Sequence, residues 1–155
     1  MPAASYVNGA SPVALLGETI GQNLFRTAQR FGDREALVVR HQNYRATYAE
    51  LWDQTACAAR GLLARGVRKG DRVGIWSPNR AEWVVMQYAT ARIGVILVTI
   101  NPAYKTAELS YVLQQSGASM ILLARKFRTA NYVKSRAFIS ASSPSFRSVP
   151  SLLRP

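Results

Sequence analysis

Few side chains in this sequence could do chemistry, and none has the spacing of a known catalytic set. Cys57 is the one cysteine and His41 the one histidine among 155 residues. Together they are too few ligands for a zinc site built by this chain. Cys57 lies in an alanine-rich helical pattern, where we expect a buried structural thiol. His41 falls in a turn with no acid or nucleophile placed beside it by sequence, so we do not expect a general base.

The acidic residues have local structural explanations, so the sequence predicts no carboxylate pair for acid–base work. Glu50 and Glu82 stand where helices are expected to begin. Asp71 falls in a tight loop, and Asp33 and Glu35 flank a turn. We therefore assign no catalytic residue, no cofactor-binding residue and no metal ligand, and the substrate-binding residues stay unknown.

Glycine spacing excludes two common nucleotide sites. The ten glycines include no Gly-x-Gly pair, so the dinucleotide-binding fingerprint is absent. The P-loop pattern Gly-x-x-x-x-Gly-Lys-Ser/Thr is absent as well. The segment 77–79, Ser-Pro-Asn, is interpreted as a turn followed by the helix cap Asn79 rather than as a nucleophile, because no base accompanies it.

The composition is that of a basic α/β protein. Twenty Lys and Arg against eight Asp and Glu give a net charge of +12. The basic residues are scattered, which is typical of a solvated surface, so we do not expect specific nucleic-acid binding. The hypothesis of an anionic-surface binder rests on charge alone. The most apolar stretch, 83–100, is interrupted by Arg92 and Gly94, so no transmembrane segment is expected. A lone cysteine and the absence of a signal-peptide pattern predict a cytoplasmic location.

Local signals predict the elements of the first half. The capping boxes Thr19-x-x-Gln22 and Thr47-x-x-Glu50 predict helices over 20–31 and 48–65. Between them, the runs 35–39 and 44–47 predict a β-hairpin. These segments follow a stretch, 1–17, that is interpreted as a flexible leader.

The second half alternates strands and helices. We expect strands over 72–76, 95–99 and 120–124, and helices over 83–93 and 108–115. This order predicts a parallel α/β sheet with right-handed crossovers. The strands 95–99 and 120–124 are apolar throughout, which is typical of strands buried on both faces. The helix 83–93 is apolar nearly all round, so it should lie between other elements.

An ordered series of short motifs resembles a known family. The motifs are Thr47-Tyr48-Ala49-Glu50-Leu51, the run from Ala64 to Ile75 (ARGVRKGDRVGI), Asn79-Arg80-Ala81-Glu82-Trp83, Gly94-Val95, Asn101-Pro102-Ala103-Tyr104 and Glu108-Leu109-Ser110-Tyr111-Val112-Leu113. At these spacings the segment from about Leu16 to Val133 resembles the opening of adenylate-forming acyl-CoA synthetases, the AMP-binding ligases. The stretches 16–21 and 101–104 are most similar to the medium-chain fatty-acid branch.

The resemblance implies a two-step ligase whose chemistry lies mostly downstream of this segment. A carboxylate would attack the α-phosphate of ATP with magnesium present, and the thiol of CoA would then displace AMP. The family's phosphate loop, Thr-Glu pair, ribose Asp and lid Lys do not occur here. No catalytic residue is therefore transferred, and we expect this chain to bind no ATP, magnesium or CoA by itself. Trp76, Trp83 and Tyr104 could support a distant acyl pocket, although core packing is favoured.

Two hypotheses remain open. The first is an N-terminal fragment of a fatty-acid–CoA ligase, inactive alone, whose partners are the missing downstream ligase segments. Here 18–133 is a partial N-terminal ligase domain, and the Ser-, Pro- and Arg-rich tail 134–155 is disordered or out of the family's reading frame. The alternative is a stand-alone, non-catalytic interaction module with a basic tail.

Overall fold

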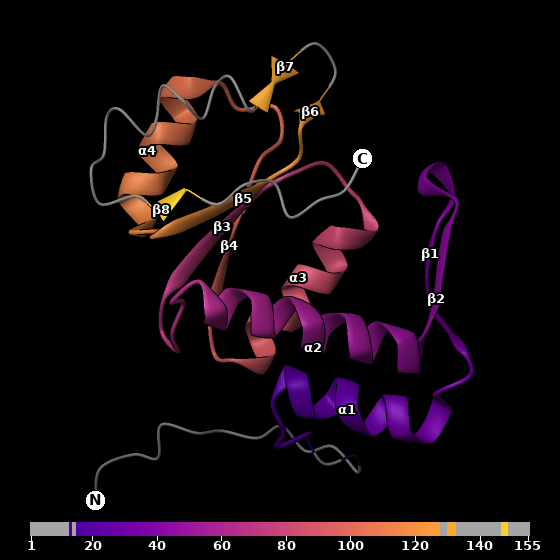
Figure 1. The fold of residues 1–155 in the computed structure, drawn as a ribbon. Coiled ribbons are helices and arrows are strands. Elements are labelled where there is room, and N and C mark those ends of the chain that lie inside the picture. Colours follow the sequence, from indigo (N-terminus) through magenta and orange to yellow (C-terminus); the bar gives the residue numbers. More distant parts are fainter. Residues whose placement is uncertain (1–12, 14, 128–129, 133–146, 149–155) are drawn as a thin grey trace, which may run out of the picture.

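The computed structural model describes residues 13, 15–127, 130–132 and 147–148. Helices and strands follow one another as a hairpin region and then an alternating α/β region (Figure 1). In chain order they are α1 (Ile20–Phe31), β1 (Glu35–Val39), the short 3-10 helix η1 (Arg40–Gln42), β2 (Tyr44–Thr47), α2 (Tyr48–Ala64), β3 (Arg72–Trp76), α3 (Ala81–Arg92), β4 (Ile96–Ile100), α4 (Thr106–Ser116), β5 (Met120–Leu123), β6 (Lys126–Phe127), β7 (Ala130–Asn131) and β8 (Arg147–Ser148).

Both predicted capping boxes are present. The Gln22 amide donates to the Thr19 hydroxyl over 3.2 Å, and the Gln22 side chain accepts from the Thr19 amide over 2.8 Å. Thr47 and Glu50 make the same reciprocal pair at the start of α2. Each box gives partners to amides that have none within the helix, so the two helix starts follow from local sequence.

The predicted hairpin and parallel sheet are confirmed. Strands β1 and β2 pair antiparallel across η1, and His41 lies exposed in that turn. The main sheet has the order β4-β3-β5-β8, with every pair parallel. Its last strand, β8, falls within the segment 134–155. The other residues of that segment, like 1–12 and 14 of the expected leader, lie outside the described residues.

Two hydrophobic clusters cover the two faces of the sheet. On the side of α4, buried residues of β3 and β5 pack with Leu109 and Leu113. On the side of α2 and α3, Val73, Ile75, Met120 and Leu122 pack with residues of both helices. Neighbouring residues of β3 and of β5 point to opposite clusters, as the two-residue period of a strand requires. Strand β5 is buried along its whole length, as expected for 120–124.

Strand β4 differs from the expectation for 95–99. It spans Ile96–Ile100, and only Ile100 is buried; Leu97 and Val98 are partly buried, and 49% of Ile96 is accessible to solvent. The prediction that this strand is buried on both faces is wrong. Among the described residues β4 pairs only with β3, so it is an edge strand, and an apolar run cannot reveal which edge of a sheet it will form.

Helix α3 lies between other elements, as its apolar surface predicted. It contacts α1 and α2 as well as β4 (Figure 1). Arg92, near its end, joins it to α2: the guanidinium lies 3.4 Å from the ring centroid of Trp52. The same group donates to the Trp52 carbonyl and the Thr55 hydroxyl, each over 2.8 Å. Among the described residues no helix is both long and apolar enough to cross a membrane.

Candidate functional site

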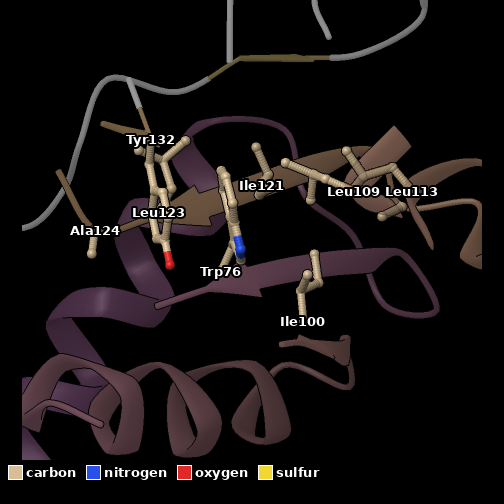
Figure 2. Packing of buried hydrophobic residues seen from close by; sticks show 9 residues of the cluster. Trp76, Ile100, Leu109, Leu113, Ile121, Leu123, Ala124 and Tyr132 are labelled. Carbon is tan, nitrogen blue, oxygen red and sulfur yellow. The ribbon is translucent and has the colours of Figure 1, made fainter. Parts of the chain in front are cut away.

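Open α/β sheets usually bind ligands at the carboxyl ends of their parallel strands, so this edge is a candidate site. In the described part of the chain, packed side chains fill the space at this edge of the sheet. Trp76, at the end of β3, is buried and donates from its indole nitrogen to the Asn101 carbonyl over 3.1 Å. The Tyr132 ring stacks on it, with centroids 3.6 Å apart, and the Tyr132 hydroxyl donates to the Pro102 carbonyl (Figure 2).

Burial affects the chemistry of Tyr132. It raises the pKa of the phenol to about 12, because the charged phenolate would lose its hydration in this core. The hydroxyl is therefore a hydrogen-bond donor at neutral pH. Through their hydrogen bonds to Asn101 and Pro102, the stacked pair links the loop after β4 to the end of β3.

The three aromatic residues considered for an acyl pocket do not meet. Trp76 belongs to the cluster beneath α4, and Tyr104 packs against that cluster. Trp83 packs against the cluster on the opposite face of the sheet. The described structure therefore supports the favoured expectation of core packing for Trp76 and Tyr104, and Trp83 lines a surface pocket described below.

The start of α3 is held by the hairpin rather than by the predicted cap. Asn79 is not the cap: Arg80 precedes the helix, and its side chain makes no capping bond. Instead, the side-chain oxygen Oε1 of Gln42 accepts from the backbone amide of Ala81 over 2.7 Å. The Gln42 amide donates to the Glu82 carboxylate over 2.9 Å. A side chain 39 residues earlier thus does what a local cap would do, and no local pattern could reveal it.

Glu82 is a fixed anion in this arrangement. Burial opposes its charge, yet the pKa of the carboxyl is lowered, because bonds from Arg80 and Gln42 stabilise the ionised form. The Arg80 guanidinium donates to both carboxylate oxygens, over 3.1 and 3.2 Å. The pair is bidentate and balances its own charge.

Two pockets flank the hairpin at this point. The tip pocket has a volume of about 310 Å³ and lies beside Val38, Val39, Arg40, His41, Asn79, Arg80, Trp83 and Val84. The helix pocket has a volume of about 450 Å³ and is lined by Gln42, Tyr44, Gln54, Cys57, Ala58, Gly61, Ala81, Glu82, Val85 and Met86. The two pockets share no lining residue: Gln42 lines the helix pocket, whereas Arg40 and His41, just before it, line the tip pocket.

Cys57 belongs to the wall of the helix pocket. It is exposed, so the expectation of a buried structural thiol is wrong. The alanine-rich run Ala56–Ala59 continues round α2, and only its Ala59 face is buried against other elements. Composition alone cannot show which face of a helix is buried when its residues are small on every side.

The described residues offer no metal site. Within the ranges that the structure describes, no three His, Cys, Asp or Glu side chains lie together as a possible metal-binding group. Glu50 is used as a cap, and Asp71 accepts from the Arg68 amide within its loop. Asp33 lies in the turn before β1, and Glu35 pairs with Arg45 across the hairpin. These residues do not fit a magnesium–ATP site, and we derive no catalytic step through one.

The family is decided by a comparison with known domains. The family model described as "AMP-binding enzyme" matches residues 24–149, most of the chain. The chain belongs to this family. The match also runs past residue 133 into the segment 134–155.

Two relatives of this AMP-binding family member are named as an acyl-CoA ligase and a putative acyl-CoA synthetase. It is 48% identical over 128 residues to the mitochondrial medium-chain acyl-CoA ligase ACSF2 of Mus musculus, covering 83% of this chain and 21% of that protein. It is 42% identical over 118 residues to the putative acyl-CoA synthetase YngI of Bacillus subtilis, covering 76% and 22%. The chain therefore spans about a fifth of the length of these relatives.

A solved structure supports the fold. The N-terminal domain of FACL13 from Mycobacterium tuberculosis superimposes with a TM-score of 0.78 at 26% identity, covering 87% of this chain and 34% of that one. The predicted fold class, an N-terminal part of an adenylate-forming enzyme's large domain, is confirmed. The residues that sequence reasoning missed are Gln42, whose partners are distant in sequence, and the lining of the two pockets.

Proposed function

We propose that this chain forms the first α/β part of the large domain of a fatty-acid–CoA ligase. In the assembled enzyme, a medium-chain fatty acid would be activated with ATP and magnesium as an acyl-adenylate and then transferred to CoA. The observation that carries this proposal is the 48% identity with the medium-chain acyl-CoA ligase ACSF2 over 128 residues. The family match and the fold support it.

The structure gives this part a supporting role. Its carboxyl sheet edge is filled by Trp76 and Tyr132, and its carboxylates Glu50 and Glu82 are engaged in a helix cap and an ion pair. We therefore propose that residues 18–133 act as a scaffold for segments that carry the phosphate loop and the lid lysine in relatives. We also propose that the leader 1–17 and the tail 134–155 are regions separate from this scaffold. Its proposed partners are the downstream ligase segments, and the fatty acid, ATP, magnesium and CoA would be bound only by the assembled enzyme.

The cytoplasm remains our proposed location. One cysteine among 155 residues suits a reducing compartment. The mouse relative, by contrast, is described as mitochondrial. Fractionation of cells that express the tagged chain tests this proposal, and recovery of the chain within mitochondria would contradict it.

A domain exchange tests the proposed function. The 128 residues of the mouse ligase that align with this chain are replaced by the chain's own, and formation of octanoyl-CoA is measured. We expect the chimera to keep activity, because the exchanged part supplies scaffold rather than reacting groups. The mouse enzyme lacking those residues is the control, and it should be inactive.

The chain alone provides the second arm of the test. We expect no fatty-acid-dependent exchange of pyrophosphate into ATP, because the phosphate loop and lid lysine do not occur among its residues. Exchange well above a blank would contradict the scaffold role. A chimera that folds cooperatively but forms no octanoyl-CoA would favour the stand-alone interaction module.

A further inference from the structure

The helix pocket has the features of a small-molecule site that the ligase chemistry does not use. We propose that it binds a small, uncharged, mainly apolar molecule with one hydrogen-bonding group, such as a straight-chain primary amide. The proposal does not depend on the ligase function, since it rests on the lining of this pocket. Its volume of about 450 Å³ falls within the usual range of ligand sites, roughly 300–1,000 Å³.

The apolar part of the wall is made by small side chains. Ala58 and Gly61 face it from α2, and Ala81 and Val85 from α3. Two helices that pack through small residues at this point leave room that larger side chains would fill. An alkyl chain placed there would exchange water contact for carbon contact on both sides, which is the favourable term for an apolar ligand.

One end of the pocket offers both a donor and an acceptor. The Tyr44 hydroxyl donates to the Gln54 side-chain oxygen over 2.5 Å. Its own oxygen can still accept, since a hydroxyl both donates and accepts. Among the described residues, the Gln54 amide group makes no further hydrogen bond. A primary amide, which carries both a carbonyl and an NH₂ group, complements this pair.

Charge selects an uncharged ligand. Glu82 lines the pocket as an ionised carboxylate. Burial is the main cause that raises the pKa of Tyr44, and the carboxylates of Glu50 and Glu82 add to it. The described lining includes no Lys or Arg side chain, so the carboxylate of an anionic ligand would lose hydration without gaining a cationic partner. A cation gains little, because Arg80 and Gln42 already hold the carboxylate. The pocket therefore disfavours the carboxylate of a fatty acid, the ligase substrate, and favours its neutral amide.

Cys57 allows binding to be measured directly, because its thiol is exposed at the pocket wall. The rate of Cys57 alkylation by iodoacetamide is followed by mass spectrometry with increasing octanamide or octanoate. We expect octanamide to slow alkylation saturably, by about tenfold when its concentration reaches ten times the dissociation constant, since only the unliganded fraction reacts. Octanoate, with the same chain length, should slow it less than twofold at equal concentration.

Two variants link the protection to the pocket. Ala58→Phe fills the pocket and should abolish protection by octanamide. Ala64→Phe adds the same ring at an exposed position of α2 and should leave protection intact. If Ala58→Phe does not fold, Gln54→Leu removes the amide partner and should weaken protection at least about fivefold, as expected for one lost hydrogen bond.

Four results would overturn the proposal. They are equal protection by octanamide and octanoate, no saturable protection by octanamide, undiminished protection in the folded Ala58→Phe variant, and a Cys57 that does not react before any ligand is added. The last would show that another part of the chain already occupies the pocket. Activity of the domain-exchange chimera is independent of all four, so failure here leaves the ligase proposal standing.

Discussion

At the scale of single residues, Gln42 connects the hairpin to the α/β region. Its side chain accepts from the first amide of α3 and donates to Glu82, which is also held by Arg80. Two polar groups in partly buried positions depend on this one side chain. Removing it leaves both without that partner, which costs more than the bonds themselves contribute.

Gln42→Ala should therefore lower the free energy of unfolding by about 1–2 kcal/mol, the usual cost of losing a helix N-cap. The urea midpoint measured by circular dichroism gives the value. Gln87→Ala, an exposed glutamine on α3 itself, serves as the control and should change stability by less than about 0.5 kcal/mol. Equal effects of the two substitutions would remove the assigned role of Gln42.

Tyr132 predicts a loss of stability at alkaline pH. Burial raises the pKa of its phenol from 10.0 to about 12, so the unfolded chain loses this proton before the folded chain does. Between these values the unfolded state binds fewer protons, and the free energy of unfolding must fall as pH rises. Below pH 10 the group should contribute no slope.

Comparison with Tyr132→Phe isolates this effect from other titrating groups. Urea titrations at several pH values between 9 and 12 should give a shallower decline for the variant, since phenylalanine has no proton to lose. Parallel curves for the two proteins would mean that Tyr132 is not protected from ionisation in the folded state.

Residues whose partners are close in sequence were predicted well, and those with distant partners were not. Glu50 was identified as a cap because its partner Thr47 lies three residues away. The prediction that Asn79 caps α3 was wrong, because the side chain that accepts from the first amide of the helix, Gln42, lies on another element. The exposure of Cys57 depends on which side of α2 other helices cover.

At the scale of elements, the same division holds. The starts of α1 and α2, the hairpin and the alternating order after β3 follow from capping boxes and hydrophobic periods. The prediction that β4 is buried on both faces was wrong, because an apolar sequence pattern does not distinguish an edge strand from a central strand. Each of the two pockets is lined by several elements that are distant in sequence, so no single segment contains its pattern.

The junction of α2 and α3 gives a prediction at this scale. The Arg92 guanidinium lies 3.4 Å from the centroid of the Trp52 ring and donates two hydrogen bonds to α2. Arg92→Lys keeps the charge but loses the planar group, so unfolding should become easier by about 1–3 kcal/mol. Arg60→Lys, exposed on α2, should have almost no effect. Thermal unfolding of both variants measures the difference.

At the scale of the whole molecule, the main sheet is covered on both faces but has an uncovered edge at β4 in the described chain. Ile96, on that edge, is 49% exposed. An exposed apolar edge strand is a site for pairing with another chain. We therefore expect the chain to self-associate at high concentration.

Ile96→Lys should reduce this association, as measured by sedimentation velocity, with little change in melting temperature. Tyr111→Lys adds the same charge on exposed α4, away from the edge. If association requires the edge, only the first substitution should reduce it. Equal reductions would show that net charge, rather than strand pairing, controls solubility.

The strand order has a consequence for synthesis on the ribosome. Strand β3 lies between β4 and β5, yet both follow it in the chain, and Leu123 is made 47 residues after Trp76. At typical translation speeds of about 5–20 residues per second, this delay lasts roughly 2–9 seconds. During that time the nascent chain carries a central strand with an empty side. The hairpin and α2 can form first, because pairing β1 with β2 needs no residue that is made later. A chaperone that recognises nascent apolar strands would therefore bind this protein while β3 emerges from the ribosome.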